Sequence, residues 1–395
     1  MSTPDPTKND PPRHITAFDT VRGLAAISVV FSHYIATYGW PTKSVAVKQA
    51  WTYSPLHIVW DGFAAVSLFY VLSGLVLSIK YFRDTKQPEL THFPLSRYLT
   101  SRVFRIWPPY LFIFILSYLL RHWGAFFEGA TIPPTNPWLF STWKASIPFA
   151  QLLREGFLIQ PGDYFLVPQG WTLPIELGIS FLVPVGILLA SRHTGWLAFF
   201  TLLLVGPLGA NYYIFHFAAG ILVAKYYQDI HDWLGPRRFW KIVVLLIGIA
   251  LYTFRFTLPV YFSWELPMSI PWIITGIGSA LLLMVVISSE SARTFLSFSW
   301  LRFIGRISYS IYLVHFLVLI MLTPRALQLL SAPKSLLGYA WWFGLAFTVL
   351  ATVGLAALSH RWVELPSISL GKSLPKYFEA WRDRRRQSTP TIEGK

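Results

Sequence analysis

Residues 17–34 read AFDTVRGLAAISVVFSHY, an apolar run with an arginine near its start and a histidine near its end. Such a run predicts a membrane-spanning helix, because about 17–25 apolar residues cross a bilayer. Ionisable side chains are costly at this depth, so Arg22 and His33 are functional candidates. Eleven residues make three helical turns plus about 20°, which places both side chains on one face, about 16 Å apart.

The composition of the whole chain excludes an ordinary soluble protein. Its 395 residues are 54% hydrophobic and only 13% charged, about half the charged fraction of soluble domains, and the mean hydropathy is +0.48. We therefore predict an all-α integral membrane protein with about ten transmembrane helices. The expected spans lie at about residues 16–38, 58–79, 104–120, 170–190, 195–209, 211–228, 239–256, 270–288, 302–322 and 338–359.

The basic residues predict the orientation of these spans. With the N-terminus inside, 25 of the 33 Lys and Arg residues fall in cytoplasmic segments and 8 outside, which favours a cytoplasmic location for both termini. The net charge of +15 is then a topology signal, and we expect contacts with membrane lipids and no nucleic-acid partner. A basic inner face fits a plasma membrane or a bacterial inner membrane.

We expect three regions along the chain. Residues 1–14 are polar and proline-rich, lack a signal-peptide pattern and predict a disordered tail. Residues 15–365 form the membrane domain, and 366–395 a basic cytoplasmic tail. The long connection at about 121–169 contains the amphipathic piece IPFAQLLREGFLIQ, which we expect to pack over the membrane face as a lid. The absence of cysteine excludes disulfides and a cysteine thioester intermediate, and we expect no bound metal.

Four titratable side chains fall in the outer half of the expected membrane region, namely His33, Asp61, Glu176 and His315. Glu176 is the one acidic residue clearly within a span, whereas Asp61 stands at a span end, where it could simply cap the helix. The four residues suggest one outer site. The sequence leaves open whether their helices are neighbours.

Arginines gather at the expected inner face. Arg22 is joined there by Arg102 and Arg105, three residues apart in SRVFRIWPPY, and a guanidinium binds phosphate bidentately. The separation of about 16 Å between Arg22 and His33 matches an extended phosphopantetheine arm. A cytoplasmic acyl-CoA could therefore place its phosphates at the arginines and its thioester near Ser73 and His33. Alternatively, the arginines could simply anchor the helices at the inner face of the membrane. Ser73-Gly74 could likewise serve only close helix packing.

Six motifs follow one another along the chain: FDTVRGLAAISVVFSHY, DGFAAVSLFYVLSGLVLS, SRVFRIWPPYL, GWTLPIELGISFLVP, RFIGRISYSIYLVH and HRWVELP. In this order they resemble the acyltransferase-3 family of multi-spanning membrane O-acyltransferases, over roughly residues 15–365. The resemblance implies transfer of an acyl group, by default acetyl, from cytoplasmic acyl-CoA to a hydroxyl of a cell-surface glycan, a lipid-linked sugar or a small molecule. It assigns family positions as follows: His33 as the essential histidine, Arg22, Arg102 and Arg105 as the arginines, Ser73-Gly74 as the Ser-Gly pair, Glu176 as the glutamate after Trp171-Thr172-Leu173, and His315 as the later histidine.

The chain departs from the family pattern in two places. PIELGISF holds a single acid where relatives often have two, which puts a second carboxylate role in doubt. We also expect no fused hydrolase-like domain after the last span.

These residues suggest a mechanism. His33 is the expected general base on the acceptor hydroxyl. Glu176 or Asp61 would orient His33 and stabilise its imidazolium, and the deeper Glu176 is favoured. His315 and Trp171 are expected to bind substrate.

Two other classes of protein compete with this interpretation. In a transporter of a small polar substrate, the same Arg, His and Glu residues would form a substrate or proton path. In a non-catalytic membrane interaction protein, replacement of His33 by alanine would have no effect.

Overall fold

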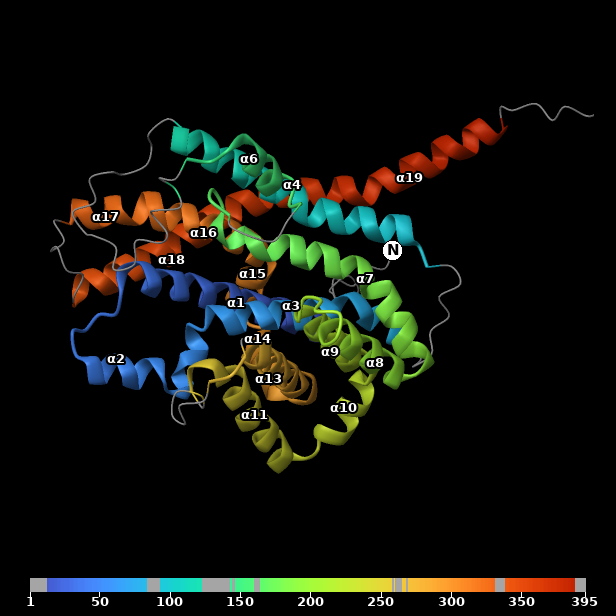
Figure 1. The fold of residues 1–395 in the computed structure, drawn as a ribbon, viewed down its shortest axis with the longest axis horizontal. Coiled ribbons are helices and arrows are strands. Elements are labelled where there is room, and N and C mark those ends of the chain that lie inside the picture. Colours follow the sequence, from blue (N-terminus) through green and yellow to red (C-terminus); the bar gives the residue numbers. More distant parts are fainter. Residues whose placement is uncertain are drawn as a thin grey trace, which may run out of the picture.

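The computed structural model describes residues 13–83, 93–122, 143, 146–159, 164–257, 259, 265–267, 269–330 and 338–387. Every regular element in these ranges is a helix, so the all-α prediction is confirmed. The helices that line the site run side by side along the long axis (Figure 1): α1 (Arg13–Tyr38), α3 (Gly62–Phe82), α4 (Leu95–His122), α7 (Thr172–Arg192) and α16 (Ser308–Leu317). α18 (Tyr339–Ser359) packs against α16.

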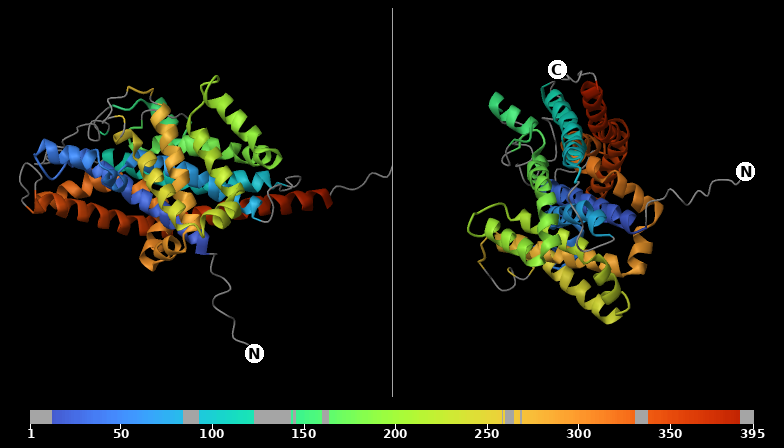
Figure 2. Two further views of the ribbon diagram at one scale, coloured as in Figure 1. Left: turned by 90° about the horizontal axis from the view of Figure 1, so that it is seen from below. Right: turned by 90° about the vertical axis from the view of Figure 1, so that its right-hand side faces the viewer.

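Helices from opposite ends of the chain are neighbours in this bundle. α1 packs against α3, α15 (Ser299–Arg306) and α16, while α3 also contacts α9 (Tyr213–Lys225) and α13 (Ser269–Ser288). α13 packs in turn against α11 (Arg238–Tyr252). α19 (Leu365–Gln387) follows α4 and then projects beyond the bundle (Figure 2).

Shorter helical elements complete the described fold. They are α2 (Val45–Thr52), η2 (Pro55–Val59), α6 (Phe149–Gly156), η3 (Pro168–Trp171), α8 (Thr194–Val205), α10 (Tyr227–Leu234), η4 (Phe254–Phe256), α14 (Glu290–Leu296), the π-helical turn η5 (Val318–Leu322), α17 (Thr323–Leu329) and the π-helical turn η6 (His360–Glu364).

Within the described residues, six helices are long and apolar enough to cross a membrane, and each matches one of the expected spans: Gly62–Phe82, Leu95–His122, Pro168–Arg192, Ser269–Ser288, Ser308–Leu329 and Tyr339–Phe378. One of the other four expected spans falls on α1. The remaining three fall on the shorter helices α8, α9 and α11, of 12, 13 and 15 residues respectively. The count of ten and the location of both termini therefore stay predictions.

The expected terminal regions and lid are described only in part. Residues 1–12 and 388–395 lie outside the described residues, as do 123–142, 144–145 and 160–163 of the expected lid. The described part of the lid includes α6, which forms the middle of the amphipathic stretch named above, and the segment at 164–169. Much of the expected C-terminal tail belongs to α19, a continuation of the last long helix.

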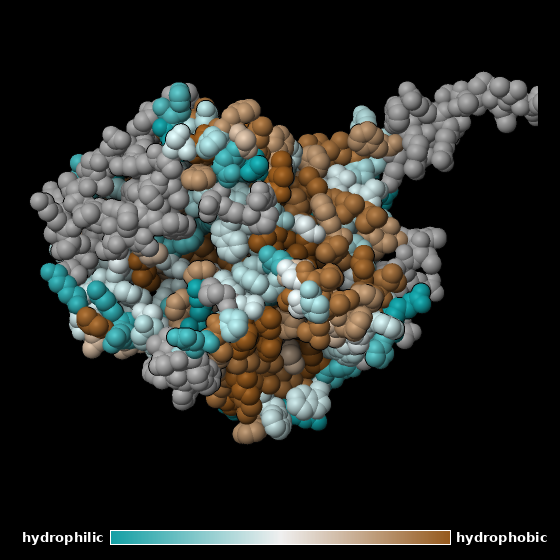
Figure 3. All heavy atoms as spheres, viewed as in Figure 1, coloured by the Kyte–Doolittle hydropathy of each residue, from teal (hydrophilic) through white to brown (hydrophobic). Residues whose placement is uncertain are grey.

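The outer surface is apolar, as a lipid-facing protein requires. Large hydrophobic side chains are exposed along α8 and α11, among them Trp196, Phe199, Phe239 and Leu246. The space-filling view shows wide hydrophobic areas over the central and right-hand helices (Figure 3). Exposed apolar surface on this scale is unfavourable in water, so the fold supports an integral membrane protein.

The Ser-Gly pair of α3 has one structural residue and one that faces the site. At Gly74, a side-chain carbon would collide with the backbone oxygen of Phe217 on α9, and at Gly220 of α9 it would collide with that of Val71. The two helices therefore cross at glycines, as small-residue packing predicts. Ser73, one position earlier, faces the other way, toward the cavity described below.

α4 contains two consecutive prolines, Pro108 and Pro109, within its length. A proline has no N–H, so Pro108 leaves the carbonyl of Phe104 without its helical donor. The Ser367 hydroxyl of α19 donates to that carbonyl. The prolines therefore help to join α4 to α19, close to the arginine segment of α4.

Candidate active site

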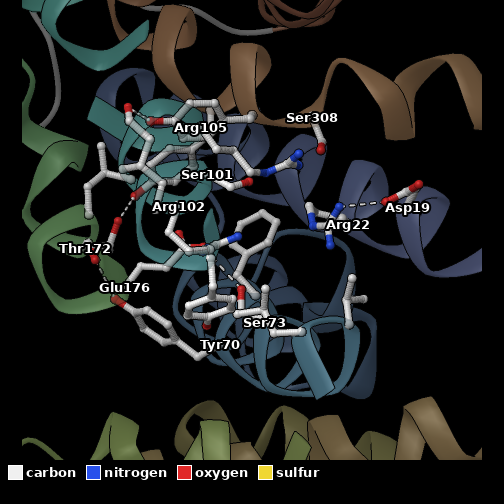
Figure 4. Close-up of a pocket in the computed structure, with 18 of the residues that line it drawn as sticks. Asp19, Arg22, Tyr70, Ser73, Ser101, Arg102, Arg105, Thr172, Glu176 and Ser308 are labelled. Atoms are coloured by element: carbon white, nitrogen blue, oxygen red, sulfur yellow. Dashed lines mark hydrogen bonds and ion pairs between the residues drawn. The ribbon is translucent and has the colours of Figure 1, made fainter. Parts of the chain in front are cut away.

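A cavity of about 510 Å³ lies among α1, α3, α4, α7 and α16 (Figure 4). The residues of α3 that line it are spaced three and four apart and so form one face of the helix: Val66, Phe69, Tyr70, Ser73, Val76, Leu77 and Lys80. From Val66 to Lys80 this face is about 21 Å long. The cavity is therefore elongated and runs along the helices.

All three arginines identified in the sequence line this cavity. Arg22 is hydrogen-bonded to Asp19 at 2.7 Å. Arg102, which is buried, donates to Glu176 at 3.2 Å, and Ser73 donates to the same carboxylate oxygen at 3.2 Å. Figure 4 shows Arg102, Glu176 and Ser73 close together, on α4, α7 and α3.

One hydrogen-bond donor in this cluster has no acceptor among the described residues. The Nε atom of Arg102 is buried and has no hydrogen-bond partner among the residues that the structure describes. A buried guanidinium N–H without an acceptor is unfavourable. Together with Arg22 and Arg105, it makes the middle of the cavity a site suited to an anion.

The two ends of the cavity differ in chemistry. One end is lined by Lys80, Pro94 and Arg97, all exposed, and forms the basic mouth. The far end is lined by neutral side chains that are largely buried, with Phe69 and Tyr312 in edge-to-face contact, ring centroids 6.0 Å apart. We call this Phe69–Tyr312 pair the end wall.

Hydrogen bonds fix the Tyr312 half of the end wall. The Tyr312 hydroxyl donates to the carbonyl of Gln169 at 2.7 Å and lies 2.7 Å from the hydroxyl of Thr172. The Gln169 side chain donates back to the carbonyls of Tyr312 and Leu313. η3, the short helical turn before α7, and the middle of α16 are thus joined.

Beyond the end wall, the structure brings together two of the predicted residues. His33 Nδ1 lies 2.8 Å from His315 Nε2, and the two rings stack with centroids 5.1 Å apart. Gly62 of α3 packs against Ser32, the neighbour of His33. Val66, where the cavity ends on α3, is one helical turn from Gly62, so the histidine pair lies about 6 Å further on.

The hydrogen bonds determine where the protons lie on this pair. His315 Nδ1 is 2.8 Å from the carbonyl of Tyr312, which can only accept, so Nδ1 carries the hydrogen. In the neutral ring, Nε2 is then the acceptor, and it accepts from His33 Nδ1. The lone pair of His33 is therefore on Nε2, where it can take a proton from a substrate.

The other predicted residues have different neighbours from those we expected. Neither Glu176 nor Asp61 forms a hydrogen bond with His33 among the described residues, because Glu176 pairs with Arg102 and Asp61 caps α3 by accepting from Ala64 N at 2.8 Å. The side chain that lies within hydrogen-bond distance of the His33 ring is His315. Trp171 is partly buried against Tyr213, with ring centroids 6.3 Å apart, and does not line the cavity.

Sequence reasoning did not single out five residues of this region: Lys80, Arg97, Gln169, Thr172 and Tyr312. Lys80 lies seven residues after Ser73 and so on the same helical face, which was an available signal. The roles of Gln169 and Thr172 depend on contacts across about 140 positions, and local sequence carries no signal for them.

A loop anchor holds the segment that leads to this region. The buried carboxylate of Glu155 on α6 accepts from the backbone N–H groups of Phe165, Leu166 and Val167 at 2.9–3.0 Å. The anchored segment runs directly into Gln169 and α7. The described part of the expected lid therefore positions the end wall.

Comparison with known proteins gives one match. A protein-family model described as an acyltransferase domain, that of the acyltransferase-3 family, matches residues 15–361. No curated protein and no solved structure matches the chain.

Proposed function

The chain belongs to the acyltransferase-3 family, and on this premise we propose that it moves an acetyl group from cytoplasmic acetyl-CoA to a hydroxyl group. The acceptor is a cell-surface glycan, a lipid-linked sugar or a small molecule. One observation carries the proposal: an elongated arginine-lined cavity ends about one helical turn from a hydrogen-bonded histidine pair.

The elongated shape of the cavity supports a donor bound lengthwise. Its phosphates would lie at Arg22, Arg102 and Arg105, where the unpartnered Nε of Arg102 is a ready donor. The exposed Lys80 and Arg97 at the basic mouth would attract the anion from the cytoplasm. The uncharged acyl end would lie at the neutral far end, so both ends of the donor find matching surroundings.

The histidine pair supplies the base. As the acceptor oxygen bonds to the thioester carbonyl carbon, its proton passes to His33 Nε2. The carbon–sulfur bond then breaks, and the sulfur takes a proton from Nε2, which leaves an ester and free CoA. His315 holds His33 in the required tautomer, the role that a carboxylate has in a serine triad.

We propose for Glu176 a different role from the one expected from the sequence. Its carboxylate bonds Arg102 and Ser73, both in the middle of the cavity, so it positions the phosphate-binding arginine. Asp61 stabilises the start of α3 as an N-cap.

The test is binding and turnover of radiolabelled acetyl-CoA by the purified protein in nanodiscs. We expect Arg102→Ala to weaken binding roughly 10- to 100-fold, because hydrogen bonds to charged groups contribute about 1.5–3 kcal/mol. We expect His33→Ala to bind with near wild-type affinity and to release no CoA.

Arg302→Ala is the matched control for charge, since Arg302 is exposed and does not line the cavity. Equal losses in Arg102→Ala and Arg302→Ala would place the donor elsewhere. If no acyl-CoA bound at all, the transporter would become the leading interpretation.

A further inference from the structure

We propose that the end wall, formed by Phe69 and Tyr312, limits the donor to a very short acyl group, and that Phe69 is the side chain that sets this limit. The inference rests on the proposed function and adds substrate selection to it.

The end wall lies where the additional carbons of a longer acyl group would extend. With the phosphates at the arginines, the thioester points toward Val66, Phe69 and Tyr312 at the far end of the cavity. Each further carbon of the acyl chain would have to pass between the Phe69 and Tyr312 rings, whose centroids are 6.0 Å apart.

Only a short distance separates the wall from the histidine pair. About one helical turn separates Val66 from the level of His33, and the acceptor hydroxyl must occupy this space to reach both His33 Nε2 and the thioester carbon. A longer acyl chain that passed the wall would displace the acceptor. The wall therefore limits the acyl chain on the side from which the acceptor approaches the thioester carbon.

The two rings of the wall differ in how firmly their neighbours hold them in place. Tyr312 is buried and held by Gln169 and Thr172. Phe69 is only partly buried and has no polar group to anchor it. A change at Phe69 would thus enlarge the end of the cavity without breaking the hydrogen bonds that join α16 to η3.

The experiment measures CoA release from acetyl-, propionyl-, butyryl- and hexanoyl-CoA by the full-length protein in nanodiscs. For the wild type we expect kcat/KM to fall about 10- to 200-fold for each methylene that a closed pocket excludes. Phe69→Ala should raise the butyryl-to-acetyl ratio of kcat/KM at least about 10-fold. Phe69→Leu should give a smaller rise and serves if the alanine variant fails to fold.

Phe63→Ala is the matched control. Phe63 is on the same helix but is exposed and packs against Trp272, away from the cavity, so its chain-length profile should equal that of the wild type. If both Phe69 variants turn over acetyl-CoA and their kcat/KM depends on acyl-chain length as in the wild type, this inference is wrong and the proposed function is unaffected. Equal use of hexanoyl-CoA by the wild type would also overturn it. Absence of binding for every acyl-CoA would overturn the proposed function and this inference with it.

Discussion

At the scale of single residues, the candidate chemistry depends on one tautomer. The carbonyl of Tyr312 places a hydrogen on His315 Nδ1, and this fixes the lone pair of His33 on Nε2. No charged partner is involved, unlike the carboxylate of a serine triad. The pair therefore adds no permanent charge to a membrane interior, where charge is costly.

Removal of His315 should abolish this control of the tautomer. We expect His315→Ala to lower kcat at least about 100-fold, because the wrong tautomer cannot act as base, with KM for acetyl-CoA near the wild-type value. His315→Gln can still accept from His33 Nδ1 through its amide oxygen and should restore part of kcat. Steady-state kinetics of both variants measure this, and equal activity of His315→Ala and wild type would exclude the role.

Glu176 offers a test between two roles. If it positions Arg102, Glu176→Gln should raise KM for acetyl-CoA about 3- to 10-fold and leave kcat nearly unchanged. If it instead supports His33, as the sequence first suggested, kcat should fall and KM should stay. Kinetics at saturating donor separate the two outcomes.

The chemistry of the site residues could be predicted from their types and spacing, but their partners could not. Arg22 and His33 were identified by helical periodicity along one run. The His33–His315 contact spans 282 positions and the Arg102–Glu176 contact 74. Such pairs depend on which helices become neighbours, and this is decided by packing across the whole bundle.

At the scale of elements, the site depends on helices that approach closely. α3 lines the cavity with one face and crosses α9 at glycines with another. Helix positions could be predicted from apolar runs. The break at Ile307, which separates α15 from α16, lay inside an expected span at 302–322. An apolar run does not show where a helix is interrupted.

A methyl group at the α3–α9 crossing should force these helices apart. We expect Gly74→Ala to lower the free energy of unfolding by about 1–3 kcal/mol, the cost of overpacking, measured as thermal and denaturant midpoints in detergent. Gly178→Ala on α7 is the control, since nothing lies within 4 Å of its added carbon. Equal midpoints for the two variants would contradict the close packing.

At the scale of the whole molecule, binding of a cytoplasmic donor requires the basic mouth of the cavity to face the cytoplasm. The all-α fold and its membrane character follow from composition and the long apolar runs, and the family match to residues 15–361 agrees with the order of the motifs. Orientation rests on the positive-inside rule, which counts charges and does not depend on the fold.

The absence of native cysteine allows a direct test of orientation. Both Lys43 and Arg302 are exposed. In intact cells, we expect Lys43→Cys to react with a membrane-impermeant maleimide, and Arg302→Cys to react only after permeabilisation. The reverse pattern would place the basic mouth on the outer side and remove the route for cytoplasmic donor.

The proposed chemistry depends on a donor that lies lengthwise between the arginines and the histidine pair. The most direct measurement is a cryo-electron microscopy structure of the protein in nanodiscs with a non-hydrolysable acetyl-CoA analogue. We predict phosphate density at Arg22, Arg102 and Arg105 and the acyl end at Phe69 and Tyr312, facing His33. Density for the analogue outside this cavity, or with its acyl end at Lys80 and Arg97, would contradict the account.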